Sequence, residues 1–395
     1  MVIESKKLWR EAESEIGYNV YFETEQLDVG PLDNSSLLAL IANCEKHSIN
    51  HEILDRHEVR RRFSGTVEIP EDWVAVVTEL GGVLKPTKAV AMFQALAIKY
   101  GAVLKDKTEI VDVETVNHGA VLKDETRIVD GEIVKHGVVL KDKTETVDAE
   151  TVKHRGGVLV TSRLGEKFWG KKCVVTAGSW VSKLVQKVSN GRMNLPIQPV
   201  ETTLCYWKIK DGYELDFTIG AGFPSFASYD HPYIYGTPAL EFPDLIKVAV
   251  HGGQECDPDT RTWGAAAPIN KGTSMLMRYL KEWIKSTFGD RIDWEDGPVM
   301  SQSCLYSMTP DGDFVIDFLG GDFNEDVVVA GGFSGHGFKM APVVGRILVD
   351  LALGGKAAAA VWDEELKHFK LNRFEGNPRG NVKGFEDQVR ISSRL

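Results

Sequence analysis

The chain has 395 residues, of which 43% are hydrophobic and 26% are charged, values typical of globular proteins with one large or two intermediate domains. Its formal net charge of −11 argues against nucleic acid or an anionic membrane surface as a partner. The five cysteines are scattered without a CxxC pair, so we predict neither a metal site nor a disulfide framework, and we expect a reducing compartment. No apolar run reaches ~18 residues, so no membrane span is expected.

The first hundred residues alternate between helical and strand patterns. Leu8, Trp9, Ala12 and Ile16 form the apolar stripe of a helix over 4–17, and this N-terminus lacks the apolar core of a signal peptide. The patterns that follow predict a strand over 18–28, a helix over 33–49 capped by Asn34 or Ser35, a strand and a short helix over 51–63, strands with a Gly-Gly turn over 66–85, and a helix from Pro86 to about Tyr100.

Three near-copies of an 18-residue unit make up residues 101–154. They read GAVLKDKTEIVDVETVNH, GAVLKDETRIVDGEIVKH and GVVLKDKTETVDAETVKH. Each copy alternates apolar and charged residues, which predicts a hairpin or two short strands. A solenoid normally needs longer units and more copies to bury a core. A local duplication and a binding arm are the two remaining interpretations.

The middle of the chain changes from hairpin to helix and then to a strand-rich block. Residues 156–180 predict a hairpin and a buried strand that ends at Ala177-Gly178, with a helix from Ser179. Residues 196–296 are aromatic and rich in strands, which suits an antiparallel sheet over a small-ligand cavity. An amphipathic helix over 273–289 closes this block.

A strand, a glycine-rich loop and a helix follow one another between Asp326 and Leu353. The run Val327–Val329 suits a strand buried on both faces, and Pro342 stands where a helix would begin. This layout points backbone N–H groups and a helix N-terminus at an electron-rich group, and the alternative is a tight turn between two core elements. The loop spacing is not that of a GxGxxG nucleotide fingerprint.

The residues just upstream of this loop extend it into one continuous signature. Residues 303–317 read SCLYSMTPDGDFVID, and residues 332–339 read GFSGHGFK. Together they resemble the C-terminal part of the monomeric sarcosine oxidase and pipecolate oxidase family, flavoenzymes that oxidise secondary amines. The resemblance continues more loosely over 1–100 and 157–380 and is closest to the plant members.

The resemblance implies a fold of α/β plus α+β class with two discontinuous domains. An FAD-binding Rossmann-like domain is expected over 1–17, 86–195 and 297–385, truncated because its first βαβ unit is missing. A substrate domain with an antiparallel sheet is expected over 18–85 and 196–296, followed by a tail over 386–395. The family has one strand segment where the repeats lie, so we expect one copy, or fragments of several, to fill that position while the rest extends outward.

The same resemblance implies where FAD would be held. Cys304 is the family position whose sulfur is joined covalently to the flavin, and a thiolate there must be accessible and activated. Ala177, Gly178 and Trp180 belong to the flavin-flanking turn. Backbone N–H groups of the glycine loop would face the flavin pyrimidine edge; the residues concerned are Gly332, Ser334, Gly335, His336, Gly337 and Lys339.

Substrate and oxygen chemistry is implied for five side chains. Lys247, in an apolar strand, resembles the lysine that lies over the flavin and assists the reduction of oxygen, and His251 on the same strand face would point to the substrate. Taken alone, Lys247 could instead reach solvent from an edge strand. Lys339 resembles the lysine that holds the substrate carboxylate, and Tyr306 and Tyr235 the tyrosines that line the amine pocket. Tyr233 and Trp207 are expected in the core.

Two functional parts of the family pattern are missing. The family begins with a strand, a GxGxxG loop and a helix that hold the FAD pyrophosphate, and this sequence contains no such segment. An arginine pair for the substrate carboxylate also lies in that region, and Arg10 and the Arg60–Arg62 run do not match its context. We interpret the difference as an incomplete gene model or an alternative start.

We therefore expect an FAD-dependent oxidase of sarcosine, pipecolate or related secondary amino acids that forms an imine and hydrogen peroxide. A flavin-free ligand- or protein-binding scaffold is the first alternative, and a dehydrogenase with another electron acceptor is the second. Which amino acid is oxidised stays open, and the family is usually monomeric. The last three residues, Ser393-Arg394-Leu395, are a conservative variant of the SKL address, so a peroxisomal import receptor is an expected partner, with a cytoplasmic location as the alternative.

Overall fold

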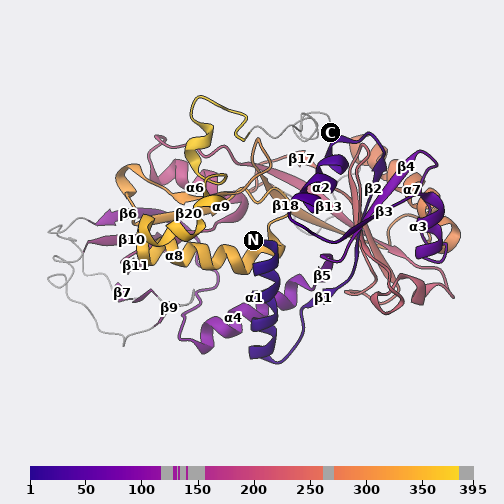
Figure 1. Cartoon of the computed structure of the whole chain (residues 1–395). Coiled ribbons are helices and arrows are strands. Elements are labelled where there is room, and N and C mark those ends of the chain that lie inside the picture. The colour runs from indigo at the N-terminus through magenta and orange to yellow at the C-terminus, as the bar shows by residue number, and fades with distance from the viewer. Residues whose placement is uncertain (117–127, 131, 134–138, 141–155, 261–270, 382–395) are drawn as a thin grey trace. The chain divides into compact units, whose positions relative to one another are not determined.

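The computed structural model describes residues 1–116, 128–130, 132–133, 139–140, 156–260 and 271–381 (Figure 1). Within these ranges the chain forms two compact units. The first contains Met1–Tyr18, Pro86–Pro199 and residues 306–381; the second contains Asn19–Lys85 and Val200–Leu305. In the described part of the chain, no helix combines the length and the apolar character that a membrane span would need.

The first unit combines two small sheets with helices. Its helices are α1 (Val2–Ile16), α4 (Pro86–Lys99), α6 (Val181–Val188), α8 (Ala341–Ala359) and α9 (Asp363–Leu366). One sheet has the order β6 (Ile110–Val116), β10 (Gly157–Ser162), β11 (Lys167–Gly170) and β7 (Ile128–Asp130), and the other has the order β12 (Cys173–Val175), β20 (Val327–Gly331) and β19 (Val315–Phe318). Two short strands, β8 (Glu132–Ile133) and β9 (Val139–Leu140), pair with each other.

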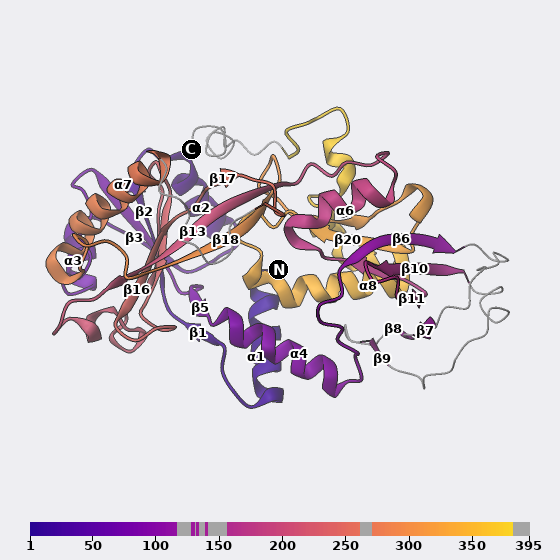
Figure 2. The same cartoon turned by 180° about the vertical axis from the view of Figure 1, so that it is seen from behind.

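Strand β20 is buried on both faces, as its apolar run predicts. Val327 and Val329 pack into a cluster with Val181 and Val185 of α6. Val328 and Ala330 pack on the other face, in the cluster that contains Val343 and Ile347 of α8. Figures 1 and 2 show β20 between these two helices in both views. The glycine loop therefore follows a strand whose position is fixed by packing in two hydrophobic clusters.

The repeats supply strands to the four-stranded sheet. β6, from the first copy, pairs antiparallel with β10, and Val116 is the partner of Gly157. β7, from the second copy, pairs parallel with β11. Whether the rest of the repeats extends outward concerns residues outside the described ranges.

The second unit is built on one nine-stranded sheet. Its strands run in the order β17 (Gln254–Glu255), β13 (Gln198–Lys208), β16 (Leu245–Val250), β15 (Ile234–Thr237), β14 (Ser225–Ser228), β2 (Gln26–Pro31), β4 (Trp73–Thr78) and β3 (His51–Leu54), and β18 (Met300–Met308) also pairs with β13. A separate pair joins β1 (Tyr21–Glu23) to β5 (Gly82–Leu84), and the helices are α2 (Ser35–Lys46), α3 (Arg56–Arg62) and α7 (Lys271–Phe288).

One face of this sheet packs against α7 (Figure 2). The core includes Trp207, which is fully buried as predicted, together with Val248 and Ile284 of α7. Gly236 of β15 is required here because a Cβ atom would lie 2.2 Å from the ring of Phe226. The ring crosses the neighbouring strand at that point, so only glycine leaves room for it.

Four expectations need correction. Residues 297–305 belong to the second unit because β18 joins the large sheet, where Val299 N–H donates to the Tyr206 carbonyl at 3.0 Å. That sheet is mixed, since β14 and β2 run parallel. The segment 18–28 forms two strands, β1 and β2, which pair with different partners. After Ala177-Gly178 a 3-10 turn precedes α6, which begins at Val181. The tail over 386–395 lies outside the described residues.

Candidate active site

A cluster of polar and aromatic side chains lies on the face of the large sheet opposite α7. Lys247 of β16 has Tyr206 and Thr237 as its register partners, and Tyr235 is the partner of Ala249. Residues that are directly opposite in an antiparallel pair share a face, and so do residues two apart on a strand. The Lys247 ammonium lies 5.5 Å from the centroid of the Tyr235 ring. That ring in turn lies 6.3 Å from the His251 ring.

Burial lowers the pKa of Lys247, while negative charge on Glu241 and Cys304 acts in the opposite direction. Glu241 accepts a hydrogen bond from the Tyr206 hydroxyl at 3.2 Å. Burial and the same carboxylate raise the pKa of Tyr206, so this phenol stays neutral at physiological pH. The arrangement holds a lysine charge in partly desolvated surroundings beside two tyrosines, and such a cation interacts strongly with charge that develops nearby.

The glycine loop of the first unit is tightly constrained. Gly332 adopts φ +63°, and a Cβ atom there would lie 2.4 Å from Cγ2 of Thr309. Ser334 also has a positive φ, and its N–H donates to the Ser307 carbonyl at 2.8 Å. Its hydroxyl accepts from the Thr309 N–H at 3.2 Å. The loop is thereby joined to the end of β18 by backbone and side-chain bonds together.

A buried ion pair supports the same region. The Arg373 guanidinium lies 2.7 Å from the Asp311 carboxylate, and the two side chains are 5% and 0% exposed. Burial alone would raise the pKa of Asp311, but Arg373 and the backbone N–H of Asn381 hold it below its usual value. Asp311 also accepts from the Thr309 hydroxyl at 3.0 Å. The Thr-Pro-Asp motif thus has a structural role beneath the glycine loop.

Helix α1 contacts the far end of the loop. The carbonyl of Lys339 accepts hydrogen bonds from the Ser5 hydroxyl at 2.5 Å and from the Trp9 indole N–H at 3.0 Å. The Lys339 side chain is exposed. His336 is exposed as well, with Nδ1 3.0 Å from the Ser334 carbonyl.

The turn after β12 lies beside the same part of the chain. Gly178 has φ +55°, and a Cβ atom added to it would meet nothing within 4 Å. The Ser179 hydroxyl donates to the Tyr306 carbonyl at 3.2 Å, and the Trp180 N–H donates to the Ala177 carbonyl at 3.0 Å. Tyr306 itself is half-buried.

The predicted site residues therefore form two groups, one in each unit. The second unit brings together Lys247, His251, Tyr235 and Cys304, and the first holds Ala177, Gly178, Trp180, Tyr306 and the loop from Gly332 to Lys339. Sequence reasoning missed Tyr206, Glu241 and the partner of Asp311. Strand alternation could have placed Tyr206 on a face, but only the register sets it opposite Lys247.

Comparison with known proteins decides the family. A family model described as FAD dependent oxidoreductase matches residues 1–133 and 126–351. The chain is 51% identical over 389 residues to the probable sarcosine oxidase of Arabidopsis thaliana, covering 98% of this chain and 82% of that protein. It belongs to the sarcosine oxidase family of FAD-dependent oxidoreductases.

More distant relatives agree with this family. The peroxisomal sarcosine oxidase of Homo sapiens is 26% identical, with 95% of this chain and 81% of that protein covered. The solved structure of NikD, an unusual amino acid oxidase essential for nikkomycin biosynthesis, superimposes with a TM-score of 0.66 at 20% identity, over 89% of this chain and 78% of that one. The fold is thus that of the amino acid oxidases, a mixed α/β structure with a sheet rich in antiparallel strands.

The residues present fit part of the FAD that this family uses. The open space at Gly178, the constrained loop at Gly332 and the buried Ser307 hydroxyl, which has no hydrogen-bond partner among the described residues, can receive the polar edge of a flavin ring. The dinucleotide end fits less well. In the described part of the chain β12 pairs with β20 alone, and the sequence has no GxGxxG loop for a pyrophosphate beside it.

Proposed function

We propose that this chain is an FAD-dependent oxidase of secondary amino acids, which converts an N-methyl or cyclic amino acid to an imine and reduces oxygen to hydrogen peroxide. The observation that carries the proposal is Lys247, a lysine with a lowered pKa beside Tyr235 and Cys304. It supports the proposal because a desolvated cation is needed where oxygen gains negative charge. The 51% identity to a protein named probable sarcosine oxidase supports the same substrate class.

The first unit is, in this proposal, a discontinuous Rossmann-like domain. Ala177, Gly178 and Trp180 would hold the flavin ring together with the N–H groups from Gly332 to Lys339, and Cys304 would be the residue that carries the covalent link. When bound, the flavin supplies the two-electron oxidation of the amine. The protein's own contribution is to orient the amine, keep water out and hold charge in place.

The side chains divide this work. The Lys339 ammonium binds the substrate carboxylate, because a charge-assisted bond fixes the amino acid in one orientation. Tyr306 and Tyr235 line the amine pocket, and His251 contacts the substrate from the same sheet face as Lys247. Lys247 holds its proton near the reacting oxygen and neutralises the charge that develops there.

Location and partners follow from the tail. Ser393-Arg394-Leu395 is read by a peroxisomal import receptor, and peroxisomes remove the hydrogen peroxide that the reaction makes. The human relative is named a peroxisomal sarcosine oxidase, which is consistent with this location. The protein acts as a monomer.

One observation favours a second candidate, a flavin-free ligand-binding scaffold. β12 has one strand partner among the described residues, and the sequence has no GxGxxG loop beside it for a pyrophosphate. Bound flavin separates the two candidates.

Visible absorbance of the purified chain before and after acid precipitation tests the proposal. We expect yellow colour that stays with the precipitate and leaves it after Cys304→Ser, whereas Cys256→Ser, a half-buried cysteine of the same unit, leaves it unchanged. Oxygen consumption with sarcosine and pipecolate then identifies the oxidase. A colourless protein that stays colourless with added FAD supports the scaffold, and reduction of a dye without oxygen consumption supports a dehydrogenase.

A further inference from the structure

A cavity of about 320 Å³ lies between α7 and the sheet of the second unit. Its walls come from β2, the segment 67–70, Trp73 of β4, Phe226 of β14 and the last three turns of α7. Protein interiors are close-packed, and volumes of about 300 Å³ and more are those of small-ligand pockets. Strand alternation puts this cavity on the face opposite Lys247, since Val248 and Phe226 share the core with α7. It is thus separate from the candidate active site.

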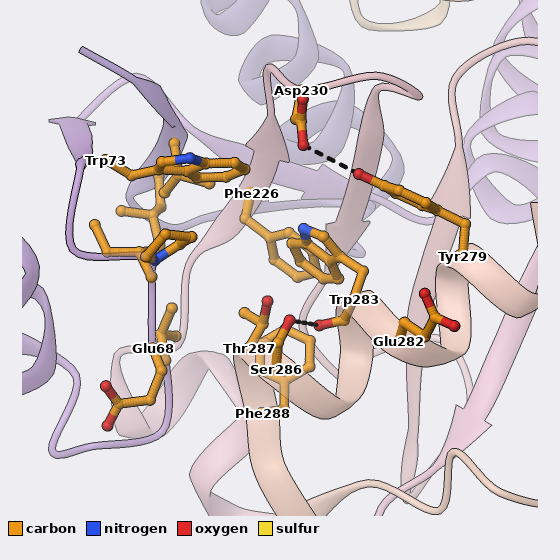
Figure 3. A pocket seen from close by; sticks show the side chains of 15 residues that line it. Glu68, Trp73, Phe226, Asp230, Tyr279, Glu282, Trp283, Ser286, Thr287 and Phe288 are labelled. Atoms are coloured by element: carbon orange, nitrogen blue, oxygen red, sulfur yellow. Dashed lines mark hydrogen bonds between the residues drawn. The ribbon is translucent and has the colours of Figure 1, made fainter.

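Aromatic rings form much of the lining. Phe226 and Trp283 are stacked with centroids 5.8 Å apart, and Phe288 meets the Trp283 ring edge-on at 5.6 Å. Figure 3 shows the half-buried Trp73 on one side of this pair and Tyr279 on the other. Ring faces carry the negative side of the aromatic quadrupole and attract cations.

The charges around the cavity have one sign. Its fifteen lining residues include three carboxylates, Asp230, Glu68 and Glu282, and no lysine, arginine or histidine. An anion would meet the negative charge of these carboxylates, so the lining selects against phosphates, carboxylates and the amino acid substrate itself. A metal ion is also a poor fit, because the described residues contain no group of three metal-ligating side chains.

Only one of these carboxylates faces the rings without a neighbouring cation. Glu68 lies 3.4 Å from Arg60, and in Figure 3 its carboxylate points away from the rings. Glu282 is 71% exposed and 4.0 Å from Arg278. The described residues give Asp230 a single bond, from the Tyr279 hydroxyl to Oδ2 at 3.1 Å (Figure 3). Burial and Asp230 raise the pKa of Tyr279, so the phenol remains a neutral donor that orients this carboxylate.

We propose that this cavity binds a small organic ammonium ion whose hydrocarbon body lies against Trp73, Phe226 and Trp283 and whose charge lies beside Asp230. A neutral apolar molecule would fill the volume but would leave the Asp230 carboxylate poorly solvated. A compact quaternary ammonium satisfies both features of the lining, because it is large, weakly hydrated and positively charged. Binding here is independent of flavin.

Calorimetric titration of the full-length chain with phenyltrimethylammonium tests the proposal. We expect saturable binding with one site per chain, at least tenfold tighter than that of tert-butylbenzene, the neutral carbon isostere. Asp230→Asn keeps an acceptor for Tyr279 and weakens the cation at least tenfold while leaving the isostere unchanged. Asp211→Asn removes the same charge from a side chain that is 97% exposed and leaves both affinities as they were.

Two further measurements keep the test decisive. Trp73→Leu keeps an apolar side chain but removes a ring, so it weakens the cation several-fold more than the isostere. Near-UV circular dichroism verifies that each variant is folded. Equal affinity for cation and isostere, or an Asp230→Asn variant that binds the cation as tightly as the parent, overturns the proposal in favour of a merely apolar cavity. Absence of saturable binding also overturns it.

Discussion

Lys247 combines a stability cost with the proposed catalytic role. Burial lowers its pKa, so the folded chain binds this proton less tightly than the unfolded chain does. The resulting destabilisation is fully present below the lowered pKa and disappears as pH rises to the unfolded value of about 10.4. A charged residue that lowers the stability of the fold at its position is a candidate for a functional role.

Lys247→Met separates the two effects. We expect the free energy of unfolding at pH 7 to be unchanged or higher, because an apolar side chain of similar length replaces a desolvated charge. Reoxidation by oxygen should slow about 100-fold, the usual effect of losing one electrostatic contact to a charged transition state. Urea unfolding and stopped-flow reoxidation measure the two, and Lys208→Met on the neighbouring strand is the matched control. An unchanged oxygen rate would exclude the proposed role.

The lowered pKa of Asp311 stabilises the folded chain, whereas the lowered pKa of Lys247 destabilises it. Its folded pKa is lowered, so its contribution to stability is present above the unfolded pKa of about 3.9 and is lost as pH falls through the folded value. Asp311→Asn should cost about 3 kcal/mol at pH 7, because Arg373 is left buried without its partner. The cost should shrink below pH 4. Urea titrations at pH 7, 5 and 3.5 test this, and a pH-independent cost would contradict it.

At the scale of elements, the glycine loop depends on one backbone conformation. Gly332→Ala combines a positive φ with a Cβ atom 2.4 Å from Thr309, so we expect a loss of about 2–4 kcal/mol and a raised KM. Gly191→Ala is the control, since Gly191 has φ +75° but open space around its Cβ position, and it should cost only about 1 kcal/mol. Equal costs for the two variants would show that the contact with Thr309 is unimportant.

The sequence predicts an element well when neighbouring residues determine it, and poorly when residues distant in the chain determine it. The helix over 4–17, the Asn34 cap and the strand–loop–helix around Gly332 follow from periodicity, capping and turn chemistry, and all three are present. The break at Thr24-Glu25 and the parallel pairing of β14 with β2 depend on partners about 200 residues away. Such register has no local signature, because the same alternation fits several neighbours.

The candidate site likewise contains residues that local motifs identify and residues that only the fold brings there. Motif residues such as Cys304 and Gly332 could be named from the sequence, whereas the roles of the named residues remain predictions. Tyr206 and Glu241 could not be named, because they reach Lys247 only through strand pairing and a loop. The Asp311–Arg373 pair spans 62 residues, and nothing near Arg373 indicates its partner.

At the scale of the whole molecule, the repeats can be removed without cutting the first unit apart. Val116 and Gly157 are register partners, so the ends of β6 and β10 lie side by side whatever joins them. Deleting residues 119–154, two whole copies, leaves β6 intact and removes the three-residue β7 together with the two-residue strands β8 and β9. We expect the thermal midpoint to change by less than about 3 °C, since closing a shorter loop offsets the lost pairing.

Deleting residues 101–118 instead is the matched control, because it removes β6 itself. Differential scanning calorimetry compares the two deletions. A large loss of stability from the first deletion, or none from the second, would show that a later copy and not the first supplies the central pairing.

The large sheet has one more consequence, because one of its faces carries the candidate active-site residues and the other packs against α7. Along β16 the side chains of Lys247 and Ala249 belong to the candidate active site, and those of Ile246, Val248 and Val250 belong to the α7 core. A saturation scan of this strand should therefore alternate residue by residue between loss of turnover and loss of abundance. Substitutions at the odd-numbered positions Lys247 and Ala249 would then affect substrate choice, whereas those at the even-numbered positions would affect only core packing. The two faces of this one strand can therefore evolve independently.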